Sequence, residues 1–170
     1  MVAAVAIPVT IFGYASWAAY HGAYREADSR LWASLGIMAE HTARVFQSID
    51  LTFTAVDTIA GDLTDDQIRA NEAALHAQLS KLEKATAAVD VITITDADGH
   101  VLVSSTMSPV PAAVNVADRD YFAAQKDHDA GSYIGEVLHP RVRQDVSDFF
   151  GVSRRRPLQN GKFTGIVAVA

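Results

Sequence analysis

A basic side chain stands at an unusual place in NVADRDYFAAQKDHDAGSYIGEV, residues 115–137. The pattern predicts a short helix, a loop and a strand, and it places Arg119 in the first turn of the helix. A cation there opposes the helix dipole, whereas the N–H groups of a helix start attract anions. Arg119 would add a bidentate donor for a carboxylate. Two interpretations remain open: Arg119 binds an anionic ligand, or it pairs with the neighbouring Asp118 or Asp120.

The other residues of this stretch suit a helix start beside a pocket. Asp118 is expected as the N-cap, and Asp120 favours the first turn. Tyr121 and Tyr133 carry rings and hydroxyl groups of the kind that line small-molecule pockets. Phe122 is expected in the core.

A second candidate wall is FFGVSRRRP, residues 149–157, which predicts a strand with alternating faces. One face carries Phe149, Gly151, Ser153 and Arg155, and the other carries Phe150, Val152, Arg154 and Arg156. A slip of one residue exchanges the faces, so the sequence does not fix the register. The small Gly151 and Ser153 leave room for a ligand and favour their face as the wall.

Three further features concern arginine and glycine around this strand. Gly151 marks a bulge or a close approach of another group. The run Arg154–Arg156 indicates a solvated strand end. Arg141 and Arg143 belong to a preceding loop that would close on an anion.

Composition excludes several kinds of chemistry. The chain has no cysteine, so it has no disulfides or thiolate metal sites. Its net charge of −6 disfavours nucleic acid as a partner. The six histidines show no metal-ligand spacing, and Asp127–Asp129 is expected to be a solvated loop. No phosphate-binding glycine loop or catalytic triad is recognisable, so we predict no catalytic residue, metal or cofactor.

Residues 1–24, Met1–Tyr24, contain no Lys, Arg, Asp or Glu and are long enough to cross a bilayer core. Interfacial aromatic residues cluster at the C-terminal end of this segment. We therefore predict a transmembrane helix. A buried core helix remains an alternative, and a cleaved signal peptide lacks its basic start. Without flanking basic residues the orientation in the membrane stays open.

Residues 25–63 predict a long, possibly coiled-coil helix, because apolar residues recur in steps of four and three. The seam consists of Leu31, Leu35, Met38, Thr42, Val45, Ile49, Thr52, Val56, Ile59 and Leu63. It either pairs with a second copy or packs on its own domain. We expect the N-terminal half to pair and the far half to pack in cis. Gly61 and Asp62 end this helix.

Residues 64–170 predict an α+β module. Thr64 and Gln67 form a capping box that starts a helix with an apolar stripe, which includes Ile68, Leu75, Leu79 and Leu82. Residues 90–105 read as a hairpin with a turn at Asp96–Gly99, and prolines 109 and 111 mark a loop. Later strands are GSYIGEVL, residues 145–157 and KFTGIVAVA, with a tight turn at Asn160–Gly161. We expect an antiparallel sheet with helices on one side.

The order of DRDYF, GSYIGEV and VSRRRPLQNGKFTGIVAVA resembles the double Cache sensor domains, which are PAS-like and belong to bacterial transmembrane receptors. The leading apolar helix and the long helix after it match as well. The resemblance implies that Met1–Tyr24 lies in the cell membrane and that the rest is extracytoplasmic or periplasmic. It also implies a ligand pocket between sheet and helix-loop layer, and further modules beyond Ala170.

The function implied is extracytoplasmic sensing of a small molecule, a carboxylate or an amino acid, by a membrane-bound homodimer. A sensor histidine kinase is the preferred receptor type, and a diguanylate cyclase or a chemoreceptor is the alternative. No enzyme activity is expected of this part. The expected ligand-binding residues are Arg119, Tyr121, Tyr133, Arg141, Phe149, Gly151 and Ser153. Two rivals are a membrane-anchored enzyme and a structural dimerisation module without a cavity.

Overall fold

The structure is a computed structural model that describes residues 13, 14, 17, 40–138 and 149–170. Contacts divide the chain into two units, Met1–Arg44 and Val45–Ala170, and the second carries the fold described below. Most of the predicted membrane segment and the seam residues Leu31–Met38 lie outside the described residues. Among the residues described, no helix is both long enough and apolar enough to span a membrane.

The second unit is an antiparallel sheet with helices. Residues 45–60 of this unit are helical. The next elements are α2 (Asp65–Ala70), α3 (Glu72–Ala85), β1 (Ile92–Thr95), β2 (Val101–Ser104), α4 (Asp120–Asp127), β3 (Tyr133–Leu138), β4 (Phe149–Arg155) and β5 (Ile166–Val169). The strand order is β2-β1-β5-β4-β3, and all neighbours are antiparallel. The α+β class is therefore confirmed.

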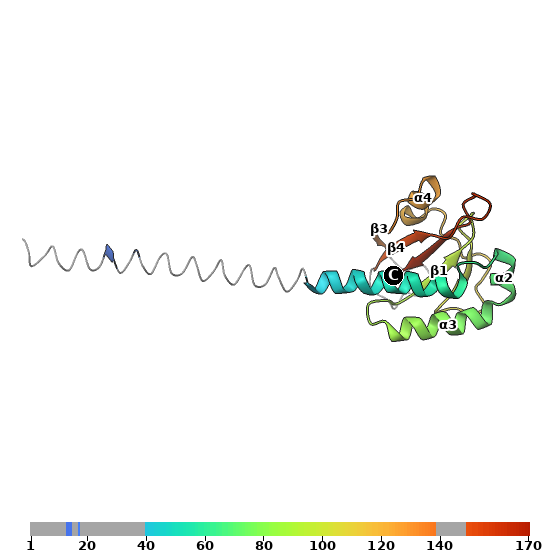
Figure 1. Cartoon of the computed structure of the whole chain (residues 1–170), viewed down its shortest axis with the longest axis horizontal. Coiled ribbons are helices and arrows are strands. Elements are labelled where there is room, and N and C mark those ends of the chain that lie inside the picture. The colour runs from blue at the N-terminus through green and yellow to red at the C-terminus, as the bar shows by residue number, and fades with distance from the viewer. Residues whose placement is uncertain (1–12, 15–16, 18–39, 139–148) are drawn as a thin grey trace, which may run out of the picture. The chain divides into compact units, whose positions relative to one another are not determined.

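Helices cover both faces of this sheet. The helix of residues 45–60 and α3 lie on one side, and α4 lies on the other (Figure 1). The expectation of helices on one side was wrong for α4. Its buried residues Tyr121 and Phe122 form a separate apolar cluster with Ile166 and Ala168 of β5. Both faces of β5 are apolar, so the strand can be covered on both sides.

The larger core lies under the helix of residues 45–60. Ile49, Phe53 and Val56 are at most 4% exposed and pack with Ile92 and Val167 of the sheet. The far half of the heptad seam therefore packs in cis, as expected. The buried face also includes residues outside the seam pattern, because this helix lies on a sheet instead of a single partner helix.

Local sequence signals set the boundaries of the next elements. The helix ends at residues 61–62, and the predicted capping box is present. The Oγ1 atom of Thr64 accepts from the backbone N–H of Gln67, and Gln67 Oε1 accepts from the backbone N–H of Thr64. The expected single helix is divided at Asn71 into α2 and α3. Ile68, Leu75 and Leu79 are buried, as predicted.

The two tight turns are also as predicted. Gly99 has a positive φ, a conformation that suits glycine, and it closes the β1–β2 hairpin. Asn160 and Gly161 both have positive φ, as a type I′ turn requires. The last strand is shorter than expected and begins at Ile166. The start of the predicted strand before Phe149 lies outside the described residues.

Candidate functional site

The two faces of β4 have different neighbours. Val152 is 2% exposed and packs in the core under the helix of residues 45–60. Gly151 and Ser153 face α4: the Ser153 Oγ atom donates to the backbone carbonyl of Tyr121 at 2.8 Å. The structure therefore places Gly151 and Ser153 on the same face, as the strand period requires.

A cavity of about 190 Å³ lies on the α4 side of the sheet. It is bordered by the start of α4, by β1, β4 and β5, and by the loop that follows β2. Its walls are mainly apolar, as is usual for small-molecule sites. The described residues that line it are Asp90, Val91, Thr93, Val101, Thr106, Met107, Val114, Asn115, Val116, Arg119, Tyr121, Phe149, Gly151, Ala168, Val169 and Ala170.

Arg119 is a half-buried cation in the cavity wall. It is the N-cap residue of α4, with extended backbone, so the expectation that Asp118 is the N-cap was wrong. Asp120 is in the first turn, as predicted. Among the described residues, the guanidinium of Arg119 has no hydrogen-bond or ion-pair partner. The surface ion pair with Asp118 or Asp120 is therefore not formed.

Tyr121 and Gly151 form the contact between α4 and β4 at the cavity. Tyr121 is 7% exposed, and its ring covers Gly151. A Cβ atom added at Gly151 would lie 3.0 Å from Cδ1 of Tyr121, closer than carbon atoms normally approach. Gly151 is thus the predicted point of close approach, and both residues line the cavity.

The predicted site residues are only partly brought together. Four of them line the cavity: Arg119, Tyr121, Phe149 and Gly151. Ser153 is fully buried behind them and bonded to α4. Tyr133 packs against the Tyr121 cluster without lining the cavity. Arg141 lies outside the described residues.

Sequence reasoning missed several lining residues. Asp90 precedes β1, Thr93 is in β1, and Asn115 and Met107 belong to the loop after β2. These positions meet only when the hairpin lies beside α4. The one signal available was the alternation of isoleucine and threonine in β1, which puts Thr93 on the face opposite Ile92 and Ile94, and it is too weak to identify a wall residue.

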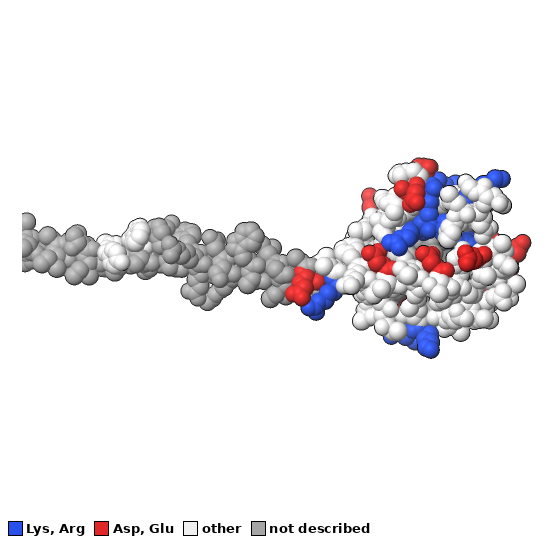
Figure 2. Space-filling view, viewed as in Figure 1, with Lys and Arg blue, Asp and Glu red and all other residues white. Residues whose placement is uncertain are grey.

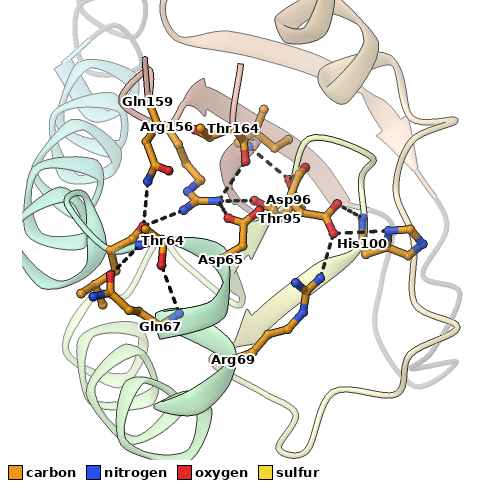
Figure 3. Close-up of polar contacts among 12 residues, drawn as sticks. Thr64, Asp65, Gln67, Arg69, Thr95, Asp96, His100, Arg156, Gln159 and Thr164 are labelled. Carbon is orange, nitrogen blue, oxygen red and sulfur yellow. Dashed lines mark hydrogen bonds and ion pairs between the residues drawn. The ribbon is translucent and has the colours of Figure 1, made fainter. Parts of the chain in front are cut away.

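The three arginines at the end of β4 differ in environment. Arg154 pairs with Asp50 at 2.8 Å, and Arg155 donates to the carbonyl of Lys126 at 3.0 Å. Arg156 is 3% exposed, so the expectation of a solvated strand end was wrong for it. Figure 3 shows its guanidinium among acceptors from α2, β1 and the segment before β5.

Charge is unevenly placed around the site. Arg119 is the basic residue and Asp90 the acidic residue among the described lining residues. Within the described part of the chain, no three His, Cys, Asp or Glu side chains lie close enough to hold a metal ion. The cavity can therefore bind an anionic group at one point of an apolar wall.

Solved structures show what this fold is similar to. No protein-family profile and no curated protein matches the chain. The extracellular domain of "the putative histidine kinase rpHK1S-Z16" is 25% identical, with a TM-score of 0.52, over 78% of this chain and 57% of that one. The chain therefore spans a little over half the length of that domain. The expected resemblance to Cache-type sensor domains is confirmed for the fold.

Two looser likenesses have TM-scores of 0.43, which are too low to support an inference about function. One is the sensor domain of the histidine kinase DctB of V. cholerae, 16% identical over 79% of this chain and 55% of that chain. The other is the ligand-binding domain of Mlp24 with asparagine, 14% identical over 76% of this chain and 53% of that chain.

Proposed function

We propose that the chain is the extracytoplasmic ligand-sensing part of a bacterial transmembrane receptor. The observation that carries the proposal is the mainly apolar cavity of about 190 Å³ whose wall contains the guanidinium of Arg119, unpaired among the described residues. A ligand with a carboxylate, such as a small organic acid or an amino acid, matches this wall. Its carboxylate would bind Arg119 through two parallel hydrogen bonds, and its apolar part would face Tyr121 and Phe149.

The receptor type proposed is a sensor histidine kinase. The likeness to an extracellular histidine-kinase domain supports it. A chemoreceptor or a diguanylate cyclase would use the same kind of domain, and the kinase, cyclase or chemotaxis output would lie in another part of the receptor. The cavity counts against the purely structural dimerisation module, because such a module needs no internal space.

The membrane segment and the dimer belong to this proposal. Met1–Tyr24 would anchor the chain in the cell membrane, and the residues after it would be extracytoplasmic. The seam from Leu31 to Val45 would pair two copies. Replacing Leu35 and Met38 with Asp should abolish crosslinking between chains near these positions. Unchanged crosslinking would show that the stripe has another contact.

A thermal-shift screen tests the sensing function. The full chain in detergent is melted with small carboxylates, amino acids and amines, each alone. A binder at a hundred times its dissociation constant should add about 2.7 kcal/mol to the free energy of unfolding. The Arg119→Ala variant is the matched control, and at the same ligand concentration it should show a clearly smaller shift. A screen in which no compound shifts the melting temperature would contradict the proposal for these ligand classes.

A further inference from the structure

Strand β4 contacts the cavity and α4 through one face and the helix of residues 45–60 through the other. We propose that β4 relays occupation of the cavity to this helix through Arg154 and Arg156. The inference rests on the proposed sensing function, since it names how the same cavity would be read out. A position between two sites does not couple them by itself, so the relay requires close contacts on both faces of β4.

The cavity face of β4 is tied closely to α4. The ring of Tyr121 touches Gly151, and both residues line the cavity. The buried Gln125 donates from Nε2 to the carbonyl of Ser153 at 3.1 Å. A ligand that pushes the Tyr121 ring toward β4 would therefore also displace the strand, because the ring already lies against Gly151.

Arg155, at the C-terminal end of β4, bonds the same face of the strand to the end of α4. Its Nη2 atom donates to the carbonyl of Lys126 at 3.0 Å, and its Nε atom donates to the carbonyl of Gln125. These carbonyls belong to the last turn of α4, where helix carbonyls lack partners within the helix. The strand and α4 are thus joined along the length of the helix and would move together.

The opposite face of β4 contacts the helix of residues 45–60, here called the long helix, through Arg154, and the segment just after it through Arg156. Arg154 places one nitrogen 2.8 Å from the carboxylate of Asp50, and its guanidinium lies 4.8 Å from the ring centre of Phe53. Arg156, just after the strand, donates to the carbonyl of Leu63 at 3.0 Å, beyond the helix end. The buried Val152, two residues before Arg154 on the same face, belongs to the core cluster that includes Ile49 and Phe53.

The two contacts differ in strength. The side chain of Arg156 is 3% exposed and fixed by several acceptors, so it acts as a pivot. The pair of Arg154 and Asp50 is one-third and two-thirds exposed, and such pairs are weak and easily re-formed. The helix can therefore turn about its C-terminal end while the Arg154 contact adjusts.

A second carboxylate is available to Arg154. Asp57 lies two helical turns after Asp50 on the same helix face. Burial raises the pKa of Asp57 above its ordinary value of 3.8, and the charge of Arg154 opposes this rise. Figure 2 shows basic atoms beside a row of acidic atoms on this side of the module. Arg154 is thus paired with Asp50 and close enough to Asp57 for the two charges to interact, so Asp57 is the carboxylate to which it would turn.

Paired spin labels test the relay in the full chain. The sequence has no cysteine, so Gln47→Cys and Lys81→Cys give unique exposed sites on the helix of residues 45–60, away from its pivot, and on α3. Gly151→Ala takes the place of a ligand in this test, because the added methyl group displaces the Tyr121 ring when no ligand is bound. We expect the mean label distance to shift by about 1–2 Å, the usual size of helix shifts in switching proteins.

Arg154→Met should remove that shift. Arg69→Met is the control, because it removes an arginine that pairs with Asp96 and does not contact the helix of residues 45–60. The relay is overturned if the shift persists in Arg154→Met, or if Gly151→Ala changes the near-ultraviolet signal of Tyr121 without moving the labels. Should Gly151→Ala not fold, Ala168→Leu fills the same cavity from β5 and carries the same expectations.

This result is separable from the ligand screen. The variants are compared without ligand. A screen that finds no binder would therefore overturn the sensing function without affecting the result of the distance measurement. A compound that raises the melting temperature and leaves the label distance unchanged would overturn the relay alone.

Discussion

The guanidinium of Arg156 lies 2.6 Å from the carboxylate of Asp65, although the two residues are 91 positions apart in the sequence. The same side chain donates to the carbonyls of Leu63, Thr95 and Thr164 at 2.9–3.0 Å. One buried cation thus joins the start of α2, the end of β1 and the segment before β5 (Figure 3). Its charge is tolerated because the donors are directed at acceptors.

Arg156→Met is therefore expected to be strongly destabilising. Removing one partner of a buried pair typically costs about 3–5 kcal/mol. Here three carbonyls would also lose a donor. Urea unfolding of the variant should show a lower midpoint than the wild type at unchanged slope. Arg69→Met, which breaks a pair on a half-exposed arginine, should cost less, because the Asp96 carboxylate keeps the backbone N–H groups of Asp98 and His100 as donors. Equal midpoints for the two variants would contradict the structural role of Arg156.

Thr64→Ala should destabilise the module through the start of α2. The substitution removes the hydroxyl that accepts from the Gln67 N–H. Loss of such a cap typically costs about 1 kcal/mol. Thr64→Ser keeps the hydroxyl and is the control. Chemical unfolding should rank wild type and Thr64→Ser together above Thr64→Ala, and an Ala variant as stable as the Ser variant would be evidence against the capping box.

Gly151→Ala is expected to cost about 1–3 kcal/mol through overpacking. The added methyl group meets the Tyr121 ring at 3.0 Å, so the ring must move. In a Tyr121→Leu background the same substitution should cost clearly less, since the ring is absent. A double-mutant cycle measures this coupling. A coupling energy of zero would show that the two residues do not constrain each other.

Asp57 should make stability depend on pH. Its folded-state pKa is raised by burial, with Arg154 opposing, so the folded state binds a proton more readily than the unfolded chain. Stability from this group is therefore present at low pH and is lost as pH rises from about 3.8 through the folded pKa. The residue is exposed overall, so the effect is small.

Asp57→Asn tests this sign. The variant should gain stability relative to wild type at pH 7, and the gain should vanish near pH 3.5. Urea midpoints across this range are the measurement, and Asp66→Asn, an exposed aspartate in the first turn of α2, is the control. A gain that grows as the pH falls would contradict the raised pKa.

Elements that depend on neighbouring residues could be predicted from the sequence. The β1–β2 hairpin, the capping box of Thr64 and Gln67, and the turn at Asn160–Gly161 each follow from a few consecutive residues. The burial of Ile49 and Val56 also follows from the seam period, whereas the period by itself fits cis and trans packing equally. In all these cases the physical cause lies within one or two turns of chain.

Features that depend on distant partners could not be predicted. Arg156 belongs to a basic run, and only its position between Leu63 and Asp65 makes it buried. The placement of α4 on the second sheet face depends on strand order, which the sequence does not state. Arg119 becomes the N-cap because α4 begins one residue later than the aspartate at 118 suggests. Local signals did identify some lining residues. The start of α4 indicated Arg119 and Tyr121, and the alternation of faces along β4 indicated Phe149 and Gly151.

Arg119 supplies the decisive prediction about the site. Its guanidinium has no partner among the described residues, so Arg119→Ala should change the stability of the ligand-free protein by less than about 0.5 kcal/mol. A charged hydrogen bond to a ligand carboxylate is worth about 1.5–3 kcal/mol, so the same variant should weaken binding about ten- to a hundredfold.

Two further variants sharpen this test. Arg119→Lys should restore only part of the affinity, because an ammonium group cannot form the bidentate pair. Tyr133→Phe should leave affinity unchanged, because Tyr133 does not line the cavity, and it is the matched control for a mutation in the same cluster. Melting without ligand and calorimetric titration with the carboxylate found in the screen are made on each variant. If Arg119→Ala lowered the melting temperature and left affinity intact, Arg119 would be a structural residue, and the cavity would lose its proposed anion contact.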